Sequence, residues 1–350
     1  MRIIIAQSRL DTFGGGERAT LELARRLSAR HAVSIVTSAY IPQRTFAGLA
    51  EFPLRITPPA EWLSQPLAAD ALVAQNFGAR LLALRRRGVI AYLHTMRSVY
   101  LRGGRRPDLA LRRALDRRAV RRAAFLLTNS AYTAERAARF YGRTPEVVPL
   151  GADEALARLE PQVGSYALYV GRLAPEKGVA RLLEWSADSP MALEVVGAGS
   201  PAQRAHLSPL LGPRARLRGP LTGPALAAAY AGARFFAFTP HAEEFGLAAL
   251  DAMAAAKPVI AVREGALPEL IEDGVTGFLV GDRDEFQRAA ERLSADDALC
   301  LRMGLAARER ARRYSWDEHA RRIEALCEQV NLTPQPPLPQ ARGSRNELSP

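Results

Sequence analysis

The sequence predicts an α/β protein built of two doubly wound domains that face each other across a cleft. Three observations carry this prediction: short apolar runs bounded by turns, helical segments that alternate with them, and a break near residue 150 after which the rhythm restarts. Parallel strands covered on both faces are buried on both sides, so each reads as a continuous apolar run. The length of 350 residues suits about two domains.

The first half opens with an apolar run at 3–6, a glycine turn at 14–16 and a segment at 17–29 whose apolar residues keep helical spacing. The segment 41–66 contains five prolines and is predicted to be irregular. Further strands are predicted at 33–37, 70–74, 89–93 and 125–128, with arginine-rich helices at about 78–87 and 107–122.

After an apolar run at 147–150, the segment GADEA is predicted to turn and to mark the domain boundary. Residues 331–350 are rich in proline and poor in core formers, which predicts disorder. Between these points we expect strands at 167–170, 193–196, 215–218, 235–238 and 259–262, and helices at 178–187, 202–210, 224–231, 246–256, 284–294, 297–313 and 316–329.

The net charge of +12 is placed unevenly along the chain. Residues 1–150 hold 25 Arg against 10 acids, which gives +15, whereas the remaining 23 basic and 26 acidic residues give −3. Residues 80–122 alone hold 14 Arg against Asp108 and Asp116, a local charge of +12. Such a region attracts phosphates, anionic lipid headgroups or nucleic acid. Solvated helix faces in an arginine-rich chain are the simpler alternative.

Cysteine content and apolar run lengths predict a cytoplasmic enzyme or binding protein. The two cysteines, Cys300 and Cys327, make no disulfide scaffold and have no metal-ligand spacing. The apolar run near the N-terminus is too short for the apolar core of a signal peptide, and no apolar stretch approaches the ~18 residues of a spanning helix.

The segment GRLAPEKG at 171–178 directly follows a predicted strand. Ligands of open parallel sheets bind beyond the carboxyl ends of the strands. Arg172 and Lys177 on such a loop suit a diphosphate, although the loop could equally be an ordinary salt-bridged one.

The segment HAEEFGLAALDAMAAAKPVIA at 241–261 places Glu243 and Asp251 eight residues apart around the start of a helix. Backbone amides at Gly246 and Leu247 would form an anion site at the helix N-terminus, and the two carboxylates could accept hydrogen bonds from sugar hydroxyls. Acids that only offset the helix dipole are the alternative.

Taken together, these segments resemble the retaining glycosyltransferases of the glycosyltransferase family 4 type, which have the GT-B fold of two Rossmann-like domains. The resemblance runs from about residue 3 to 328. It rests on GRLAPEKG at 171–178, EEFGLAALD at 243–251, AMAAAKPVIA at 252–261 and REGALPELIEDGVTGFLV at 263–280, with weaker matches in GGGE at 14–17, LHT at 93–95, TNSAYTA at 128–134 and VPLGAD at 148–153.

The resemblance implies a division of labour between the domains. Residues 1–153 would form a Rossmann-like acceptor domain and 154–315 a Rossmann-like nucleotide-sugar domain, with 316–330 a helix returning to the first and 331–350 a disordered tail. Arg172 and Lys177 would neutralise the donor diphosphate, and Glu243 would contact the transferred sugar. Further donor contacts are expected from Gly15, Gly16, Gly197, Gly246 and Leu247, and His94 would lie near the sugar.

Two residues depart from the family pattern. Asp251 stands where the second glutamate of the Glu-x7-Glu motif would bind the ribose, and Ala256 stands where glycine usually follows the helix. The reaction implied is hexosyl transfer from a nucleotide-diphosphate sugar to a glycan or lipid-linked acceptor, by front-face attack with retention and without a metal. The D-x-D sequence Asp282–Arg283–Asp284 is expected to cap a helix rather than hold a metal.

Three alternatives remain open. VVGAGSPA at 195–202 is a weak match to a nicotinamide-binding fingerprint, because no acid follows at the required distance. An epimerase with the GT-B fold, or a sugar-nucleotide binding protein without activity, would share the same residues. Nucleic-acid binding lacks a recognisable module beside the charge, so the expected partners are a nucleotide sugar, the acceptor and an anionic membrane face contacted by 80–122.

Overall fold

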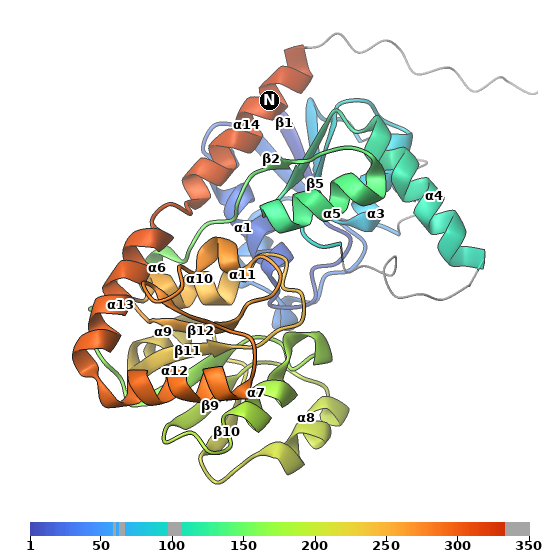
Figure 1. The fold of residues 1–350 in the computed structure, drawn as a ribbon. Coiled ribbons are helices and arrows are strands. Elements are labelled where there is room, and N and C mark those ends of the chain that lie inside the picture. The colour runs from blue at the N-terminus through green and yellow to red at the C-terminus, as the bar shows by residue number, and fades with distance from the viewer. Residues whose placement is uncertain (59–60, 63–66, 97–106, 333–350) are drawn as a thin grey trace, which may run out of the picture. The chain divides into compact units, whose positions relative to one another are not determined.

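The computed structural model describes residues 1–332 apart from 59–60, 63–66 and 97–106, and it contains two parallel sheets (Figure 1). Contacts within the chain divide it into two compact units. Among the described residues, the first lies within 1–92, 107–126 and 323–332, and the second comprises 93–96 and 127–322. The last residue of β5 (Val89–Leu93), Leu93, and the described residues after it up to Met96 therefore belong to the second unit.

The first sheet has seven strands in the order β3-β2-β1-β4-β5-β6-β7. The pairs β1–β2, β1–β4, β2–β3, β4–β5 and β6–β7 are parallel. Strands β4 and β5 are buried along their whole length, as a sheet covered on both faces requires. The strands are β1 Arg2–Ala6, β2 Ala32–Thr37, β3 Leu54–Ile56, β4 Ala71–Ala74, β5 Val89–Leu93, β6 Phe125–Thr128 and β7 Glu146–Val147. The helices are α1 Gly15–Ser28, α3 Phe77–Arg80, α4 Pro107–Arg122 and α5 Ala131–Tyr141, with 3-10 turns at Pro42–Arg44, Ala47–Glu51 and Leu81–Leu84.

The second sheet has six parallel strands in the order β10-β9-β8-β11-β12-β13. Its strands are β8 Tyr166–Val170, β9 Ala192–Val196, β10 Ala215–Gly219, β11 Ala233–Phe238, β12 Val259–Val262 and β13 Gly277–Val280. Its helices are α6 Glu154–Ala157, α7 Val179–Trp185, α8 Pro201–Leu207, α9 Gly223–Gly232, α10 Leu247–Ala254, α11 Leu267–Leu270, α12 Arg283–Ala295, α13 Asp297–Ala311 and α14 Trp316–Leu332, with 3-10 turns at Pro175–Lys177 and Ser208–Leu210.

Both sheets follow one connection rule, the 3-2-1-4-5-6 order of Rossmann-like folds, which confirms the predicted fold class. In each sheet the strand order reverses at one point, between β1 and β4 in the first and between β8 and β11 in the second. Ligands of such sheets bind beyond the carboxyl ends of the strands at this switch point. The segments that follow β8 and β11 are therefore where a ligand is expected in the second unit.

Some elements differ from the sequence prediction. The irregular segment 41–66 contains the short strand β3, whose exposed residues leave no apolar run to find. The helix predicted at 78–87 is the single turn α3, capped by the Asn76 side chain, followed by a 3-10 turn. Strand β13 and helix α5 were not predicted. The tail predicted to be disordered lies outside the described residues from 333 onward.

Helix α14 ends in the first unit, where it is held by charged groups. Glu324 is nearly buried, pairs with Arg30, and lies 2.6 Å from Nε2 of His31. Of the helices within the described ranges, none has the length and apolar character that crossing a bilayer requires.

Candidate active site

The loops after β8 and β11 touch each other through their backbones. Gly178 has φ +67, and a Cβ there would overlap the carbonyl oxygen of Thr239. The Thr239 hydroxyl donates to the Gly178 carbonyl at 2.9 Å, and the amide of His241 donates to the Glu176 carbonyl at 2.9 Å. Glycine at 178 is needed both for the left-handed turn and for this close approach. The contact brings together two motifs that lie more than 60 residues apart in sequence.

The structure joins two of the predicted site residues in an ion pair. Nζ of Lys177 lies 3.0 Å from Oε1 and 2.8 Å from Oε2 of Glu243. The side chains are only 20% and 12% exposed, so water screens this pair much less than it screens a surface pair. An ammonium group has three N–H donors, so Lys177 can serve both carboxylate oxygens and still donate to a ligand.

Arg172 is placed by a buried tyrosine. The hydroxyl of Tyr169, whose pKa burial raises, donates to the Arg172 carbonyl at 3.0 Å. The guanidinium is half exposed and lies 3.3 Å from Glu176. An exposed pair of this kind contributes little, so a phosphate can take the place of Glu176 at small cost. Arg172 and Lys177 therefore supply two cations within one short loop.

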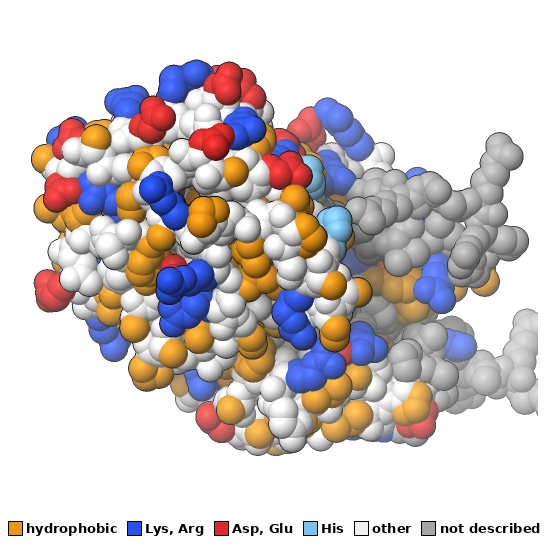
Figure 2. Space-filling view, turned by 90° about the horizontal axis from the view of Figure 1, so that it is seen from below, with side chains coloured by type: hydrophobic (Ala, Val, Ile, Leu, Met, Phe, Trp, Pro, Cys, Tyr) orange, Lys and Arg blue, Asp and Glu red, His pale blue; other side chains and the backbone are white. Residues whose placement is uncertain are grey.

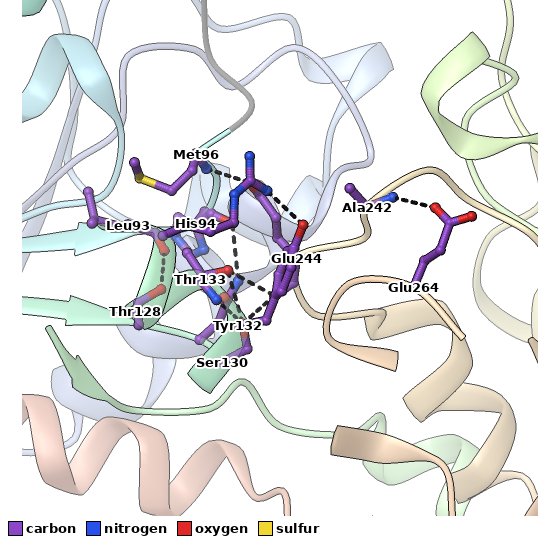
Figure 3. Close-up of polar contacts among 12 residues, drawn as sticks. Leu93, His94, Met96, Thr128, Ser130, Tyr132, Thr133, Ala242, Glu244 and Glu264 are labelled. Carbon is purple, nitrogen blue, oxygen red and sulfur yellow. Dashed lines mark hydrogen bonds and ion pairs between the residues drawn. The ribbon is translucent and has the colours of Figure 1, made fainter. Parts of the chain in front are cut away.

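The backbone before Glu243 is unusual and is braced by a network that sequence reasoning missed. Ala242 has φ +48, a left-handed conformation that is rare for alanine. Arg181 donates to the carbonyls of Thr239 and Pro240 and to Oε1 of Glu264. The other carboxylate oxygen of Glu264 accepts from the Ala242 amide at 3.3 Å, as Figure 3 shows. Burial raises the pKa of Glu264, but Arg181 and the Ala242 amide outweigh it and lower the pKa below its ordinary value.

The carbonyl of Glu243 is fixed by the segment after β12. It accepts from the Ala266 amide at 2.8 Å, and a Cβ on Gly265 would overlap it. The Glu243 backbone is thus held by Ala266, the preceding Ala242 by Glu264, and the Glu243 side chain by Lys177. These supporting residues lie in REGA at 263–266, which is part of the motif at 263–280, but the motif alone does not reveal that they hold Glu243.

The start of α10 and the end of β9 place the predicted glycines. Gly246 precedes α10 with φ +95, and no side chain caps this helix among the described residues. The anion site expected at its first-turn amides stays a prediction. Leu247 is the first residue of the helix. A Cβ on Gly197 would overlap the carbonyl of Gly171, so glycine lets the ends of β8 and β9 pack together. Gly15 and Gly16 begin α1 in the first unit.

Asp251 is buried on α10 with 7% of its surface exposed, and its Oδ1 accepts from the Asp153 amide at 3.0 Å. This structural contact was not foreseen, and the predicted ribose contact stays a prediction. His94 follows β5 within the second unit, is partly buried, and its carbonyl accepts from Nδ2 of Asn129 at 3.1 Å. Asp282 caps α12 through a 2.9 Å bond from the Glu285 amide, which confirms the predicted capping role.

Two family models together match nearly the whole described chain. "Glycosyltransferase Family 4" matches residues 13–156, and "Glycosyl transferases group 1" matches residues 157–310. With two Rossmann-like domains whose switch-point loops carry the charged motifs, the chain is of the glycosyltransferase class. It belongs to the glycosyltransferases of the family 4 type, with the GT-B fold.

Relatives named D-inositol 3-phosphate glycosyltransferase share part of the sequence. The protein of Streptomyces bingchenggensis is 32% identical over 65% of this chain and 58% of its own length, and that of Streptomyces griseus is 31% identical over 74% and 63%. The matched region thus spans about three-fifths of these relatives.

Solved structures share the fold at low identity. Anabaena HepE in complex with UDP and glucose has a TM-score of 0.80 at 19% identity, covering 94% of this chain and 100% of that one. WaaG, a glycosyltransferase involved in lipopolysaccharide biosynthesis, has a TM-score of 0.74 at 16% identity, covering 95% and 100%.

Proposed function

We propose that this chain transfers a hexosyl group from a nucleotide-diphosphate sugar to a glycan or lipid-linked acceptor, with retention at the anomeric carbon and without a required metal. The observation that carries the proposal is the Lys177–Glu243 pair beside Arg172, at the switch point of the second sheet. This arrangement places two cations within reach of a departing diphosphate and one carboxylate within reach of its sugar.

The roles follow from the charge and reach of each group. Arg172 and Lys177 would stabilise the negative charge that develops on the leaving diphosphate, as would the amides at Gly246 and Leu247. Glu243 would accept hydrogen bonds from sugar hydroxyls and Asp251 from the ribose. Gly15, Gly16 and Gly197 would let backbone approach the donor, and His94 would contact the transferred sugar.

The comparisons support the substrate classes without naming them for this chain. Neighbouring structures hold UDP and UDP-glucose, which supports a nucleoside diphosphate as the leaving group. The relatives are named for a phosphorylated inositol acceptor, which supports an anionic acceptor here. The arginine excess of the first half would attract such an acceptor.

A binding panel followed by a transfer assay tests the proposal. Thermal shift with UDP, GDP, ADP and the matching nucleotide sugars should find one nucleotide that raises the melting temperature, since a ligand stabilises by RT ln(1 + [L]/Kd). Arg172→Ala should reduce that shift. Arg158→Ala, which removes an exposed arginine that pairs with Glu154 on α6, is the matched control.

Transfer with the selected donor, analysed by NMR of the anomeric proton, should give a product with the donor's configuration, with or without a chelator. An inverted product or loss of activity with the chelator would contradict retention or metal independence. An epimerised nucleotide sugar would point to the epimerase alternative, and binding without any turnover to the binding-protein alternative.

We also propose that the basic part of the first unit docks on an anionic membrane surface. On α4, Arg112, Arg117, Arg118 and Arg121 are exposed, and Leu111 beside them is 62% exposed. Arg80 is instead buried against Asp116, and Arg86 donates to the carbonyls of Leu67 and Ala69, so these two are not available for docking. Arg97, Arg102, Arg105 and Arg106 lie outside the described residues. Figure 2 shows a face of the molecule on which basic, acidic and apolar side chains are mixed.

A further inference from the structure

Two adjacent glutamates follow β11, and they have different partners. Glu243 pairs with Lys177 at the switch point. Glu244 is buried, with 6% of its surface exposed, and makes its contacts with two other segments of the second unit (Figure 3). A carboxylate is rarely buried to this degree without partners that hold it there.

The side chain of Glu244 holds the segment that directly follows His94. Its Oε1 accepts from the Met96 amide at 2.6 Å, and the Thr95 side chain also hydrogen-bonds to the carboxylate. Nη1 of Arg136 lies 3.7 Å from the same oxygen. The partners are thus one backbone amide, one side-chain donor and one guanidinium. Of these, the first two belong to Met96 and Thr95, which are the two residues that follow His94.

The backbone of Glu244 holds the start of α5. Its carbonyl accepts from the hydroxyl of Ser130 at 2.6 Å and from that of Thr133 at 3.2 Å. Ser130 is also the N-cap of α5, since its side chain accepts from the Thr133 amide. Asn129, one residue earlier, donates to the carbonyl of His94. The chain around His94 is therefore held from both sides, by Glu244 and by the segment that Glu244 itself anchors.

Burying the Glu244 carboxyl group among these partners costs free energy that an apolar side chain would not cost. Burial, and to a smaller extent the neighbouring charge of Glu243, raise its pKa above the ordinary value, and the bonds from Thr95 and Met96 and the charge of Arg136 offset this only in part. An apolar side chain would fill the same space without desolvating a charge, but it would leave the Met96 amide without its acceptor. Only a side chain with an acceptor oxygen at position 244 can bind the Met96 amide and so fix the conformation of residues 94–96.

We infer that Glu244 is a positioning residue, which holds His94 in register with Glu243 through the Met96 amide and the Ser130 hydroxyl. The inference rests on the proposed function, in which His94 and Glu243 face the transferred sugar. Glu244 acts through the backbone of its neighbours and not on the substrate. Since the two glutamates are consecutive, any shift of the segment 94–96 relative to Glu244 is a shift relative to Glu243.

Hydrogen exchange tests the positioning directly. In Glu244→Ala the amides of 94–96 should exchange at least about tenfold faster than in the wild type, while peptides covering 166–180 should be unchanged. Glu244→Gln keeps an acceptor oxygen and should restore most of the protection. Glu135→Gln, which removes an exposed carboxylate paired with Arg139 on α5, is the matched control and should leave 94–96 as in the wild type.

Kinetics then separates positioning from binding. With the donor found by the panel, Glu244→Ala should lower kcat at least about tenfold, because small misplacement of reacting groups is costly, while the Kd of the free nucleoside diphosphate changes less than about twofold. Glu244→Gln should recover most of kcat. A general loss of folding would instead move the Kd and the exchange of 166–180 as well.

Several results would overturn the inference: wild-type exchange at 94–96 in Glu244→Ala, a kcat unchanged despite faster exchange, or failure of Glu244→Gln to restore protection. The exchange measurement needs no substrate. If the wild type turned over no nucleotide sugar, the proposed function would fail. Exchange would still decide whether Glu244 holds the segment 94–96.

Discussion

The loops after β8 and β11 and the helix α4 both carry positive charge, but they hold it in different ways. In the loops, Lys177 is mostly buried and paired with Glu243. On α4, Arg117, Arg118 and Arg121 are exposed to water. The loops belong to the half of the sequence with a net charge of −3, and the helix to the half with +15. The net charge of a region therefore indicates whether it attracts an anionic surface. A buried ion pair at the ends of the strands instead indicates a candidate catalytic site.

The largest effect should come from breaking the buried pair from either side. Lys177→Ala removes a cation and leaves the Glu243 carboxylate beside the donor diphosphate, so transfer should fall at least about a hundredfold and nucleoside diphosphate binding at least about tenfold. Glu243→Gln removes a negative charge from the same place. It should reduce transfer at least about tenfold yet bind the free nucleoside diphosphate more tightly.

Isothermal titration of both variants with the nucleoside diphosphate measures this difference. Opposite changes in Kd support a site in which Glu243 and the diphosphate share Lys177. If Glu243→Gln weakened nucleoside diphosphate binding as much as Lys177→Ala, the ion pair would only maintain the shape of the site. Buried pairing would then not distinguish these loops from α4 as a place of chemistry.

The second effect concerns the exposed charge. Replacing Arg117, Arg118 and Arg121 together by glutamine should weaken binding to vesicles rich in anionic lipid by about a hundredfold, at ~1 kcal/mol for each basic residue near the surface. Because the three side chains are exposed, folding and nucleoside diphosphate binding should stay as in the wild type. Co-sedimentation with vesicles of graded anionic content and at graded salt is the measurement. Vesicle binding that is independent of both anionic lipid content and salt concentration would refute the docking proposal.

The third prediction concerns Asp251, which the structure gives a second task. Asp251→Ala should lower the free energy of unfolding by about 1–3 kcal/mol, because the Asp153 amide loses its acceptor, and should weaken nucleoside diphosphate binding by roughly tenfold to a hundredfold. Asp251→Asn keeps an acceptor oxygen and should recover most of the stability but only part of the affinity. Denaturant titration and calorimetry separate the two quantities. Lower stability with wild-type affinity would make Asp251 purely structural.

The fold could be predicted because the central strands are buried on both faces and so appear as apolar runs. Strand β11 is buried along all of its length, and its prediction at 235–238 was displaced only at the start. Strand β3 pairs at the edge of its sheet with two exposed residues, and no local pattern reveals such a strand. Helix α5 was missed although Ser130 caps it and its buried residues Ala134, Ala137 and Tyr141 keep helical spacing, because two of these three are small alanines that do not stand out as an apolar face.

The site could be predicted in its residue types but not in its pairings. Lys177 and Glu243 are 66 residues apart, and their contact depends on Gly178 packing against Thr239, which no local rule gives. The chain's other lysine shows why residue type alone is weak evidence. Lys257 is fully buried, donates to the carbonyls of Gln162 and Ala231, and has its pKa lowered by burial to about 8. Its role is structural.

The smallest effect comes from Ala256, which ends α10 in a conformation that suits glycine. Ala256 has φ +55, its amide donates to the carbonyl of Met253, and the Lys257 amide donates to that of Ala252. These two bonds form a Schellman motif, whose left-handed position is usually glycine, because an L side chain there costs about 1–2 kcal/mol. A Cβ on Gly304 would overlap the Ala256 carbonyl, so the turn is held tightly.

Ala256→Gly relieves that strain but also removes a buried methyl group and loosens the unfolded chain, so its net effect on stability should stay within about 1 kcal/mol. Ala254→Gly removes an equally buried methyl from a right-handed helical position and should simply destabilise. The difference between the two variants in free energy of unfolding, about 1–2 kcal/mol in favour of Ala256→Gly, isolates the left-handed strain. Both changes leave the Lys177–Glu243 pair and the α4 arginines intact, so nucleoside diphosphate and vesicle binding should not move. Equal destabilisation by the two variants would show that the turn tolerates alanine without strain.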